Sequence, residues 1–201
     1  MAPRDRRCKV NMKDISLIGF MGCGKSSVGK ILATLLPECR LIDLDTYIEE
    51  KQGKNIPEIF NEYGEAAFRR MEREALEEIF SDKSRPRAIL SLGGGTVTSE
   101  QCRQLIRQHT DCFYLRATTD TLLDNLEGHS DGRPMLNPTQ PVEAQSTETS
   151  SEREALRHRI ESLMQTRSPQ YIATAHHIID IDGLSFAQIA EAVEANILNI
   201  K

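Results

Sequence analysis

The sequence has no long hydrophobic run. Its longest apolar segments are strand-sized, such as Ile15 to Met21, whereas a membrane-spanning helix needs about 20 apolar residues. The N-terminal segment is positively charged but has no apolar stretch behind it, so it is not typical of a secretory signal. We therefore expect no transmembrane segment and no membrane partner. We interpret residues 1–12 as a flexible N-terminal arm, with a translational start at Met12 as the alternative.

Cysteine is too scarce and too irregularly spaced to form a disulfide framework. The chain has five cysteines, an odd number, and none of them forms a CxxC pair: Cys8, Cys23, Cys39, Cys102 and Cys112. This spacing argues against a structural zinc site as well. Free thiols are typical of a reducing compartment, so we expect a cytoplasmic location.

The chain also lacks a strong excess of charge of either sign. It has 25 Lys and Arg against 30 Asp and Glu, a formal net charge of -5. No long-range field therefore attracts the whole protein to nucleic acid, and we expect no nucleic-acid partner. Any anion-binding site must be formed locally.

Short β-rich runs alternate with longer helical patterns along the chain. Such alternation predicts a parallel sheet, and the continuous apolar character of several runs suits strands that helices bury on both faces. We predict an α/β fold of three layers, a five-stranded parallel sheet flanked by helices, in one domain over residues 13–201. The predicted strands are Ile15–Gly19, Leu41–Asp45, Ala88–Leu92, Cys112–Leu115 and His177–Ile181.

Helical periodicity and end signals predict the helices between these strands. Asn55 lies three residues before Glu58, with Pro57 in the first turn, and this pattern predicts the start of a short helix that Gly64 ends. The segment 137–151 is polar and rich in Ser and Thr near its end, so we interpret it as a mobile insertion. The other predicted helices are Lys25–Leu36, about Glu65–Phe80, Ser99–Gln108, Thr119–Leu126, Glu152–Met164 and Ser185–Ile197.

The segment Gly19–Ser26 matches the pattern G-x-x-x-x-G-K-[ST] between a predicted strand and a predicted helix, the context of a phosphate-binding loop. Its glycines allow backbone N–H groups to curl around phosphate oxygens, and the helix N-terminus adds a positive dipole. Lys25 can reach the β- and γ-phosphates, and the Ser26 hydroxyl can ligate Mg²⁺. The predicted phosphate-binding residues are Gly22, Cys23, Gly24, Lys25, Ser26 and Ser27.

Cys23 lies inside this loop, where a helix N-terminus and Lys25 would favour the thiolate. One hypothesis is that alkylation of Cys23 blocks the nucleotide site. The alternative is that Cys23 is only a small residue at a crowded turn.

Asp43 and Asp45 lie at the carboxyl end of the second predicted strand, at the edge where open α/β sheets bind ligands. Two residues apart on a strand, both carboxylates face the same way. One can orient Mg²⁺ through water while the other accepts a hydrogen bond from a substrate hydroxyl. An Asp-x-Asp at a strand end is otherwise a common turn or helix cap, and this alternative stays open.

Taken in order, six segments resemble the motif series of the shikimate kinase family. The resemblance spans about residues 14–195 and implies a P-loop fold with a mobile lid, Mg²⁺ as cofactor, and ATP-dependent phosphorylation of the 3-hydroxyl of shikimate. It places Mg²⁺ on Ser26 and, through water, on Asp43. The segments are Gly19–Ser26, Asp43–Asp45, Phe68–Glu72, Leu92–Gly95, Arg133–Leu136 and Arg167–Tyr171.

The resemblance also implies a role for each matching residue. Lys25, Asp45 and Arg133 would be catalytic, and Arg133 would also contact the phosphates from a lid at about 127–137 that excludes water. Glu72, three residues after Arg69 on one helix face, would orient that guanidinium toward a carboxylate. Shikimate would be held by Asp45, Arg69, Glu72, Gly93, Gly94, Gly95 and Arg167.

The sequence departs from the family pattern in two places. Members of the family often have an Arg ahead of the lid that packs against adenine, where this chain has Asn125 and Leu126. The insertion at 137–151 is also longer than the family usually has. Two alternatives to a shikimate kinase remain: a P-loop kinase for another acceptor, such as gluconate or a nucleotide, and a nucleotide-binding module without turnover. The resemblance further suggests a monomer.

Overall fold

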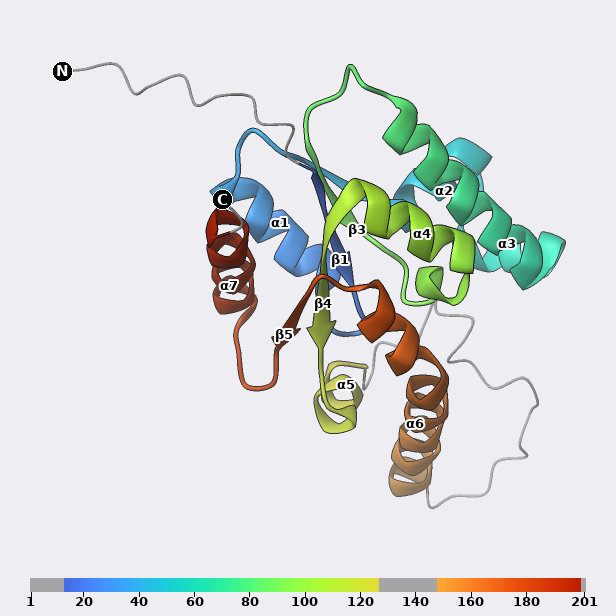
Figure 1. The fold of residues 1–201 in the computed structure, drawn as a ribbon. Coiled ribbons are helices and arrows are strands. Elements are labelled where there is room, and N and C mark those ends of the chain that lie inside the picture. Colours follow the sequence, from blue (N-terminus) through green and yellow to red (C-terminus); the bar gives the residue numbers. More distant parts are fainter. Residues whose placement is uncertain (1–12, 127–147, 200–201) are drawn as a thin grey trace.

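The computed structural model describes residues 13–126 and 148–199, and within that part of the chain five parallel strands form one sheet (Figure 1). The strand order is β2-β3-β1-β4-β5, so β1 is central and β2 and β5 are the edges. The predicted α/β fold with five parallel strands is confirmed. The strands are β1 (Asp14–Ile18), β2 (Arg40–Asp43), β3 (Ala88–Ser91), β4 (Thr110–Arg116) and β5 (His177–Asp180).

Helices cover both faces of the sheet, with α1 and α7 on one side and α2, α3 and α4 on the other (Figure 1). Alternate residues of the strands point to opposite faces, so Leu17 and Phe113 pack on the side of α1 and α7, whereas Leu90 and Tyr114 pack on the side of α3 and α4. The helices are α1 (Lys25–Leu35), α2 (Leu44–Gln52), α3 (Ile56–Ser81), α4 (Glu100–His109), α5 (Thr119–Leu126), α6 (Glu148–Thr174) and α7 (Phe186–Asn199), with a 3₁₀ turn at Thr96–Thr98.

The predicted placement of Asp45 on a strand is wrong. Strand β2 ends at Asp43, whose side chain caps α2 by accepting a hydrogen bond from the Thr46 N–H at 3.4 Å. Asp45 therefore lies in the first turn of α2, a helix that the sequence reading did not predict. The cap alternative for Asp-x-Asp is confirmed, because an Asp that ends a strand can satisfy the free N–H groups of the next helix.

Gly64, with φ 78°, breaks the helical backbone inside α3 as expected, and the two segments continue as one element. Both ends of α6 differ clearly from the prediction. Helix α6 begins at Glu148, so the predicted insertion ends earlier than residue 151, and it continues through Pro169 to Thr174 rather than ending at Met164. Ser and Thr are favoured at helix starts, and the axis of α6 bends along its length in Figure 1, as a proline requires. Residues 1–12 and the predicted lid at 127–137 lie outside the described residues.

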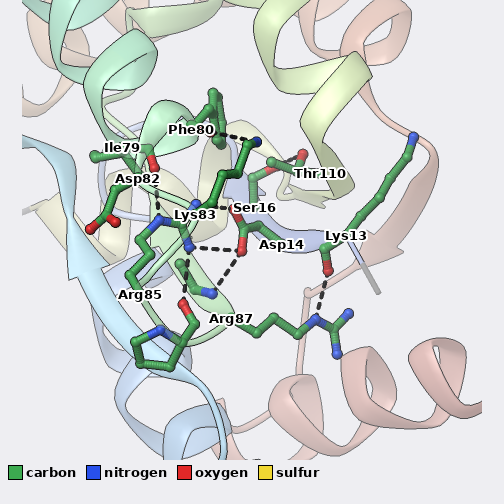
Figure 2. A network of polar contacts seen from close by, with 12 residues as sticks. Lys13, Asp14, Ser16, Ile79, Phe80, Asp82, Lys83, Arg85, Arg87 and Thr110 are labelled. Atoms are coloured by element: carbon green, nitrogen blue, oxygen red, sulfur yellow. Dashed lines mark hydrogen bonds and ion pairs between the residues drawn. The ribbon is translucent and has the colours of Figure 1, made fainter. Parts of the chain in front are cut away.

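A polar network fixes the amino-terminal edge of the sheet (Figure 2). Asp14, at the start of β1, accepts hydrogen bonds from the Arg85 guanidinium at 3.0 Å and from the backbone N–H of Ala88 at 2.8 Å. Arg87 donates to the carbonyl of Lys13 at 2.6 Å. These bonds join β1 to β3 at the edge opposite the P-loop, and so hold in register the two strands whose other ends carry the site. Among the described helices, none is both long and apolar enough to cross a membrane.

Candidate active site

The loop between β1 and α1 surrounds the amino group of Lys25. Lys25 is 8% exposed, and its Nζ donates to the carbonyl oxygens of Gly19 and Phe20, each at 2.9 Å. Gly24, the N-cap of α1, has a left-handed backbone with φ 86°, which glycine adopts without steric cost. The result is an ammonium group held inside the curl of the loop at the positive end of a helix, an arrangement suited to phosphate oxygens.

The thiol of Cys23 points into the protein. Cys23 is 0% exposed, its Sγ lies 3.7 Å from Lys25 Nζ, and its backbone N–H donates to the Phe20 carbonyl at 3.2 Å. A reagent therefore has no direct access to this sulfur, which favours the alternative of a small residue at a crowded turn. The phosphate-binding role predicted for Cys23 would require its amide to leave the bond within the loop.

Two hydroxyls and one carboxylate meet where the P-loop faces the carboxyl ends of β2 and β3. Ser26 Oγ donates to Asp43 Oδ2 at 2.7 Å, and it lies 3.1 Å from Ser91 Oγ. Ser91, the last residue of β3, was not predicted in the site, although its place at a strand end is a signal that could have revealed it. This group of hard oxygen atoms is the donor chemistry that Mg²⁺ prefers.

Arg69, on the other wall of the site, is held by the exposed Glu65 and the buried Glu72. Arg69 Nη1 lies 2.7 Å from Glu72 Oε2, and Nη2 lies 3.0 Å from Glu65 Oε1. Glu72 is 0% exposed, and its other oxygen accepts the hydroxyl hydrogen of Thr96. Burial raises the pKa of Glu72, and the Arg69 guanidinium opposes that rise. The predicted orientation of Arg69 by Glu72 is present, and Thr96 adds a support that the sequence did not reveal.

Asp45 faces this wall of the site from the first turn of α2. Its Oδ1 is buried without a hydrogen-bond partner among the described residues, and it lies near Gly93, where an added Cβ would be 3.0 Å from it. Burial raises the pKa of Asp45 to about 7, and the carboxylates of Glu72 and Asp43 add to the rise while Lys25 opposes it. A carboxyl group that titrates near neutrality and has a free oxygen is suited to accept a proton.

Arg167 reaches the same place from α6. It is 3% exposed, its Nη1 has no hydrogen-bond partner among the described residues, and its guanidinium lies 5.9 Å from the centre of the Phe20 ring. A buried cation with an unused donor is costly unless an anion binds it, so Arg167 is suited to bind an anionic ligand.

One cavity of ≈ 710 Å³ joins these groups. It unites the predicted phosphate-binding loop, both aspartates, both arginines and the three glycines that follow β3, which therefore lie together as the sequence reading required. The lining residues are Met21, Gly22, Gly24, Lys25, Ser26, Ser27, Asp43, Asp45, Ile56, Phe60, Phe68, Arg69, Glu72, Ser91, Leu92, Gly93, Gly94, Gly95, Asn125, Arg167 and Phe186. Arg133, predicted to be catalytic, lies outside the described residues.

Several lining residues were missed by sequence reasoning. Ile56 and Phe60 form an apolar wall with Phe68, and their spacing on α3 signals only a helix face. Asn125 donates from Nδ2 to the Gly22 carbonyl at 2.9 Å, so one of the residues that replace the family's Arg contacts the P-loop itself. Phe186, the first residue of α7, is 43% exposed and lies against Gly24, where an added Cβ would be 2.5 Å from its ring.

A P-loop at the end of the central strand, open to a cavity with two arginines and a carboxylate, defines a P-loop kinase of small-molecule acceptors. The sequence profile described as "Shikimate kinase" matches residues 21–197. The chain belongs to the shikimate kinase family.

Relatives and solved structures agree with this assignment over most of the chain. A shikimate kinase of Thermus thermophilus is 35% identical over 179 residues, which is 89% of this chain and 86% of that protein. The shikimate kinase of Chlorobaculum tepidum is 37% identical over 187 residues, with 91% of each chain covered. The structure of a shikimate kinase from Acinetobacter baumannii in complex with shikimate has a TM-score of 0.78 and 30% identity, and the match covers 94% of this chain and 95% of that one.

Proposed function

We propose that this chain transfers the γ-phosphoryl group of ATP to the 3-hydroxyl of shikimate, giving 3-phosphoshikimate and ADP. The observation that carries the proposal is the single cavity in which Lys25 of the P-loop faces Asp45, Arg69 and Arg167. An acceptor with one carboxylate and several hydroxyls complements two guanidinium groups and a free carboxylate oxygen. The related Acinetobacter baumannii enzyme, whose structure contains shikimate, supports this choice of acceptor.

The residues have two kinds of role, which are positioning of the acceptor and stabilisation of the charge on the phosphoryl group. Arg69 and Arg167 would bind the acceptor carboxylate, and the N–H groups of Gly93 to Gly95 would approach it closely. Asp45 would orient the attacking hydroxyl and take its proton, while Lys25 would neutralise the charge that develops on the transferred phosphoryl group. Arg133 is proposed from the sequence alone to stabilise that charge from the lid.

Mg²⁺ fits the oxygen atoms that Ser26 and Asp43 present. The two side chains are hydrogen-bonded to each other and line the cavity beside the P-loop. Mg²⁺ usually binds through one or two protein oxygens together with water and substrate phosphates, so this small donor set is sufficient. The ion would be held by the Ser26 hydroxyl and, through water, by Asp43, and when bound it would neutralise phosphate charge.

The nucleobase end of ATP is proposed to lie beside Phe186. This exposed ring covers Gly24 next to the phosphate site, and the residue replacing the family's Arg, Asn125, is hydrogen-bonded to the P-loop. We expect Phe186→Ala to raise the KM for ATP about tenfold, because base stacking on an aromatic ring contributes about 1–3 kcal/mol. Leu184→Ala is the matched control, since Leu184 is 39% exposed and does not line the cavity. Equal KM values for the two variants would contradict the assignment.

A substitution at Gly95 tests the proposed acceptor site, on the other side of the cavity. Its φ of -103° suits any residue, but an added Cβ would lie 2.6 Å from Arg69 Cζ. Gly95→Ala should therefore displace the Arg69 guanidinium and raise the KM for shikimate at least about tenfold, the loss expected for one charge-assisted hydrogen bond. The dissociation constant of ATP should stay unchanged in the same variant. A shikimate KM equal to that of the parent would show that Arg69 is not needed where it lies.

An ADP-release assay decides among acceptors. The purified chain is supplied with MgATP and, in separate reactions, with shikimate, gluconate or a nucleoside monophosphate. We expect turnover with shikimate well above the ATPase background and none with the others. Absence of shikimate turnover would refute the proposed substrate, and nucleotide binding without ADP release for any acceptor would favour a module without turnover.

We also propose the domain organisation, the location and the oligomeric state of the chain. The strands within residues 13–126 and 148–199 form one sheet, which supports a single kinase domain over residues 13–201. The cysteines described by the structure are free and buried, which suits the cytoplasm. We also propose a monomer whose partners are ATP and shikimate, and sedimentation of the purified chain would test this.

A further inference from the structure

Tyr171 contacts the glycine turn of the acceptor site without lining the cavity. It lies on α6 one turn after Arg167, it is 0% exposed, and its hydroxyl donates to the carbonyl oxygen of Gly94. Burial raises the pKa of Tyr171, an effect that the Arg167 charge opposes, so the hydroxyl stays protonated and remains a donor. This hydroxyl therefore connects α6, the helix that also carries Arg167, with the glycine turn.

The turn at Gly93 to Gly95 uses all its carbonyls inside the protein. The Gly93 carbonyl accepts from the Thr96 N–H at 3.1 Å, the Gly95 carbonyl accepts from the Thr98 N–H at 2.9 Å, and the Gly94 carbonyl accepts from Tyr171. In the described ranges 13–126 and 148–199, no hydrogen bond occupies the N–H group of any of these three glycines. Their N–H groups therefore remain available to a ligand in the cavity that they line.

Because the peptide bond is planar, the hydrogen bond from Tyr171 to the Gly94 carbonyl also fixes the direction of an N–H group. The Gly94–Gly95 peptide is trans, so its N–H points opposite to its carbonyl. A hydrogen bond that holds the Gly94 carbonyl toward α6 therefore also sets the direction of the Gly95 N–H. Glycine has no side chain to restrict its backbone, so this turn depends on such an external bond for a defined orientation.

The aromatic ring of Tyr171 is positioned by a neighbour of the same size. Tyr114 of β4 stacks on it with ring centroids 4.9 Å apart and an interplanar angle of 21°. Among the described residues, the Gly94 carbonyl accepts from the Tyr171 hydroxyl and not from that of Tyr114. The two tyrosines thus share a buried environment and differ in what their hydroxyls contact, which provides a matched control.

We propose that Tyr171 is a positioning residue for the acceptor site, whose hydroxyl orients the Gly94–Gly95 peptide. The inference rests on the proposed function for its kinetic consequence, although the orientation of the glycine turn does not depend on the identity of the acceptor. Within the Arg167–Tyr171 segment, the proposed acceptor contacts assign a role to Arg167 but none to Tyr171. The inference gives a role to this tyrosine, which lies one helical turn after Arg167.

The kinetic test uses Tyr171→Phe, which retains the ring and its stacking and removes only the hydroxyl. We expect the KM for shikimate to rise about tenfold, consistent with the loss of one buried hydrogen bond. The KM for ATP should stay near that of the parent, and the melting temperature should fall by only a few degrees, because the Gly94 carbonyl loses its donor. Tyr114→Phe should leave the KM for shikimate unchanged. Equal effects of the two variants, or an effect of Tyr171→Phe on ATP and shikimate alike, would overturn the proposal.

A second measurement separates this inference from the choice of substrate. Selective ¹⁵N labelling of glycine gives at most twelve backbone resonances, because the chain has 12 glycines. Without any ligand, Tyr171→Phe should shift the Gly95 resonance and speed its hydrogen exchange, and Tyr114→Phe should not. An unchanged Gly95 resonance in Tyr171→Phe overturns the proposal. A shifted Gly95 resonance supports the proposal even if shikimate is not the acceptor. Only the ADP-release assay would show that the choice of acceptor is wrong.

Discussion

Replacing Asp45 by asparagine is expected to lower kcat by about 10³-fold, within the range found for loss of a general base, while raising the melting temperature at pH 8. Catalysis is lost because asparagine cannot take the proton of the attacking hydroxyl. Stability rises because the folded protein holds Asp45 with a pKa raised to about 7 from 3.8, chiefly through burial. Ionised Asp45 is therefore a cost to the fold that function retains.

The pH dependence of this stability effect follows from linkage. A folded-state pKa above the unfolded one means that the folded protein binds the proton more tightly, so Asp45 costs nothing below pH 3.8. The cost grows as pH rises toward the folded value of about 7 and is constant above it. The shift corresponds to about 4 kcal/mol, and we expect asparagine to recover about 2 of these, because its amide must also be desolvated. Thermal unfolding should show a gain of about 5 °C at pH 8 and almost none at pH 4.

The control is Glu50→Gln, which removes the same charge from an exposed position on α2. It should change neither kcat nor the melting temperature.

In the parent protein, kcat/KM should fall about tenfold per pH unit below a pKa of about 7, as expected for a base that must be ionised. An Asp45→Asn variant that keeps more than a tenth of the parent kcat, or that melts earlier at pH 8, would contradict the assignment.

Replacing Arg69 or Arg167 by methionine should raise the KM for shikimate about 100-fold in each case, since each loses a charge-assisted pair with the carboxylate. The two changes should have opposite effects on stability. Arg69→Met leaves Glu72 buried without its cation and should destabilise the fold by about 3 kcal/mol. Arg167 has no carboxylate partner among the described residues, so Arg167→Met should stabilise the fold by about 1 kcal/mol.

A double variant distinguishes this cause from general disruption. If Arg69→Met destabilises because Glu72 loses its partner, then Arg69→Met combined with Glu72→Met should recover most of the free energy of unfolding without recovering activity. Denaturant unfolding and the shikimate KM are measured for all variants. Equal losses of stability in Arg69→Met and Arg167→Met would show that the loss of the cation beside buried Glu72 is not the reason why Arg69→Met destabilises the fold.

Most of the sheet was predictable because its signals are local. Apolar runs and the Gly19–Ser26 motif identified each strand and the loop within a few residues. Helix α2 was missed because its start is a cap by Asp43, and Asp-x-Asp at a strand end is compatible with both a strand and a helix. Helix α6 was predicted too short because a proline usually ends a helix, whereas here the helix continues past Pro169 and Tyr171 is buried against Tyr114.

The site residues were predicted by resemblance to a motif series, and the structure supplied the reasons for which they work together. The sequence alone determined the P-loop, because a contiguous segment contains its glycines, Lys25 and the helix that follows. Only the tertiary structure decided that the pKa of Asp45 is raised to about 7, that Thr96 supports Glu72, and that Tyr171 holds Gly94. Burial and contacts between separate elements set these properties, and neither is encoded in any one segment of the chain.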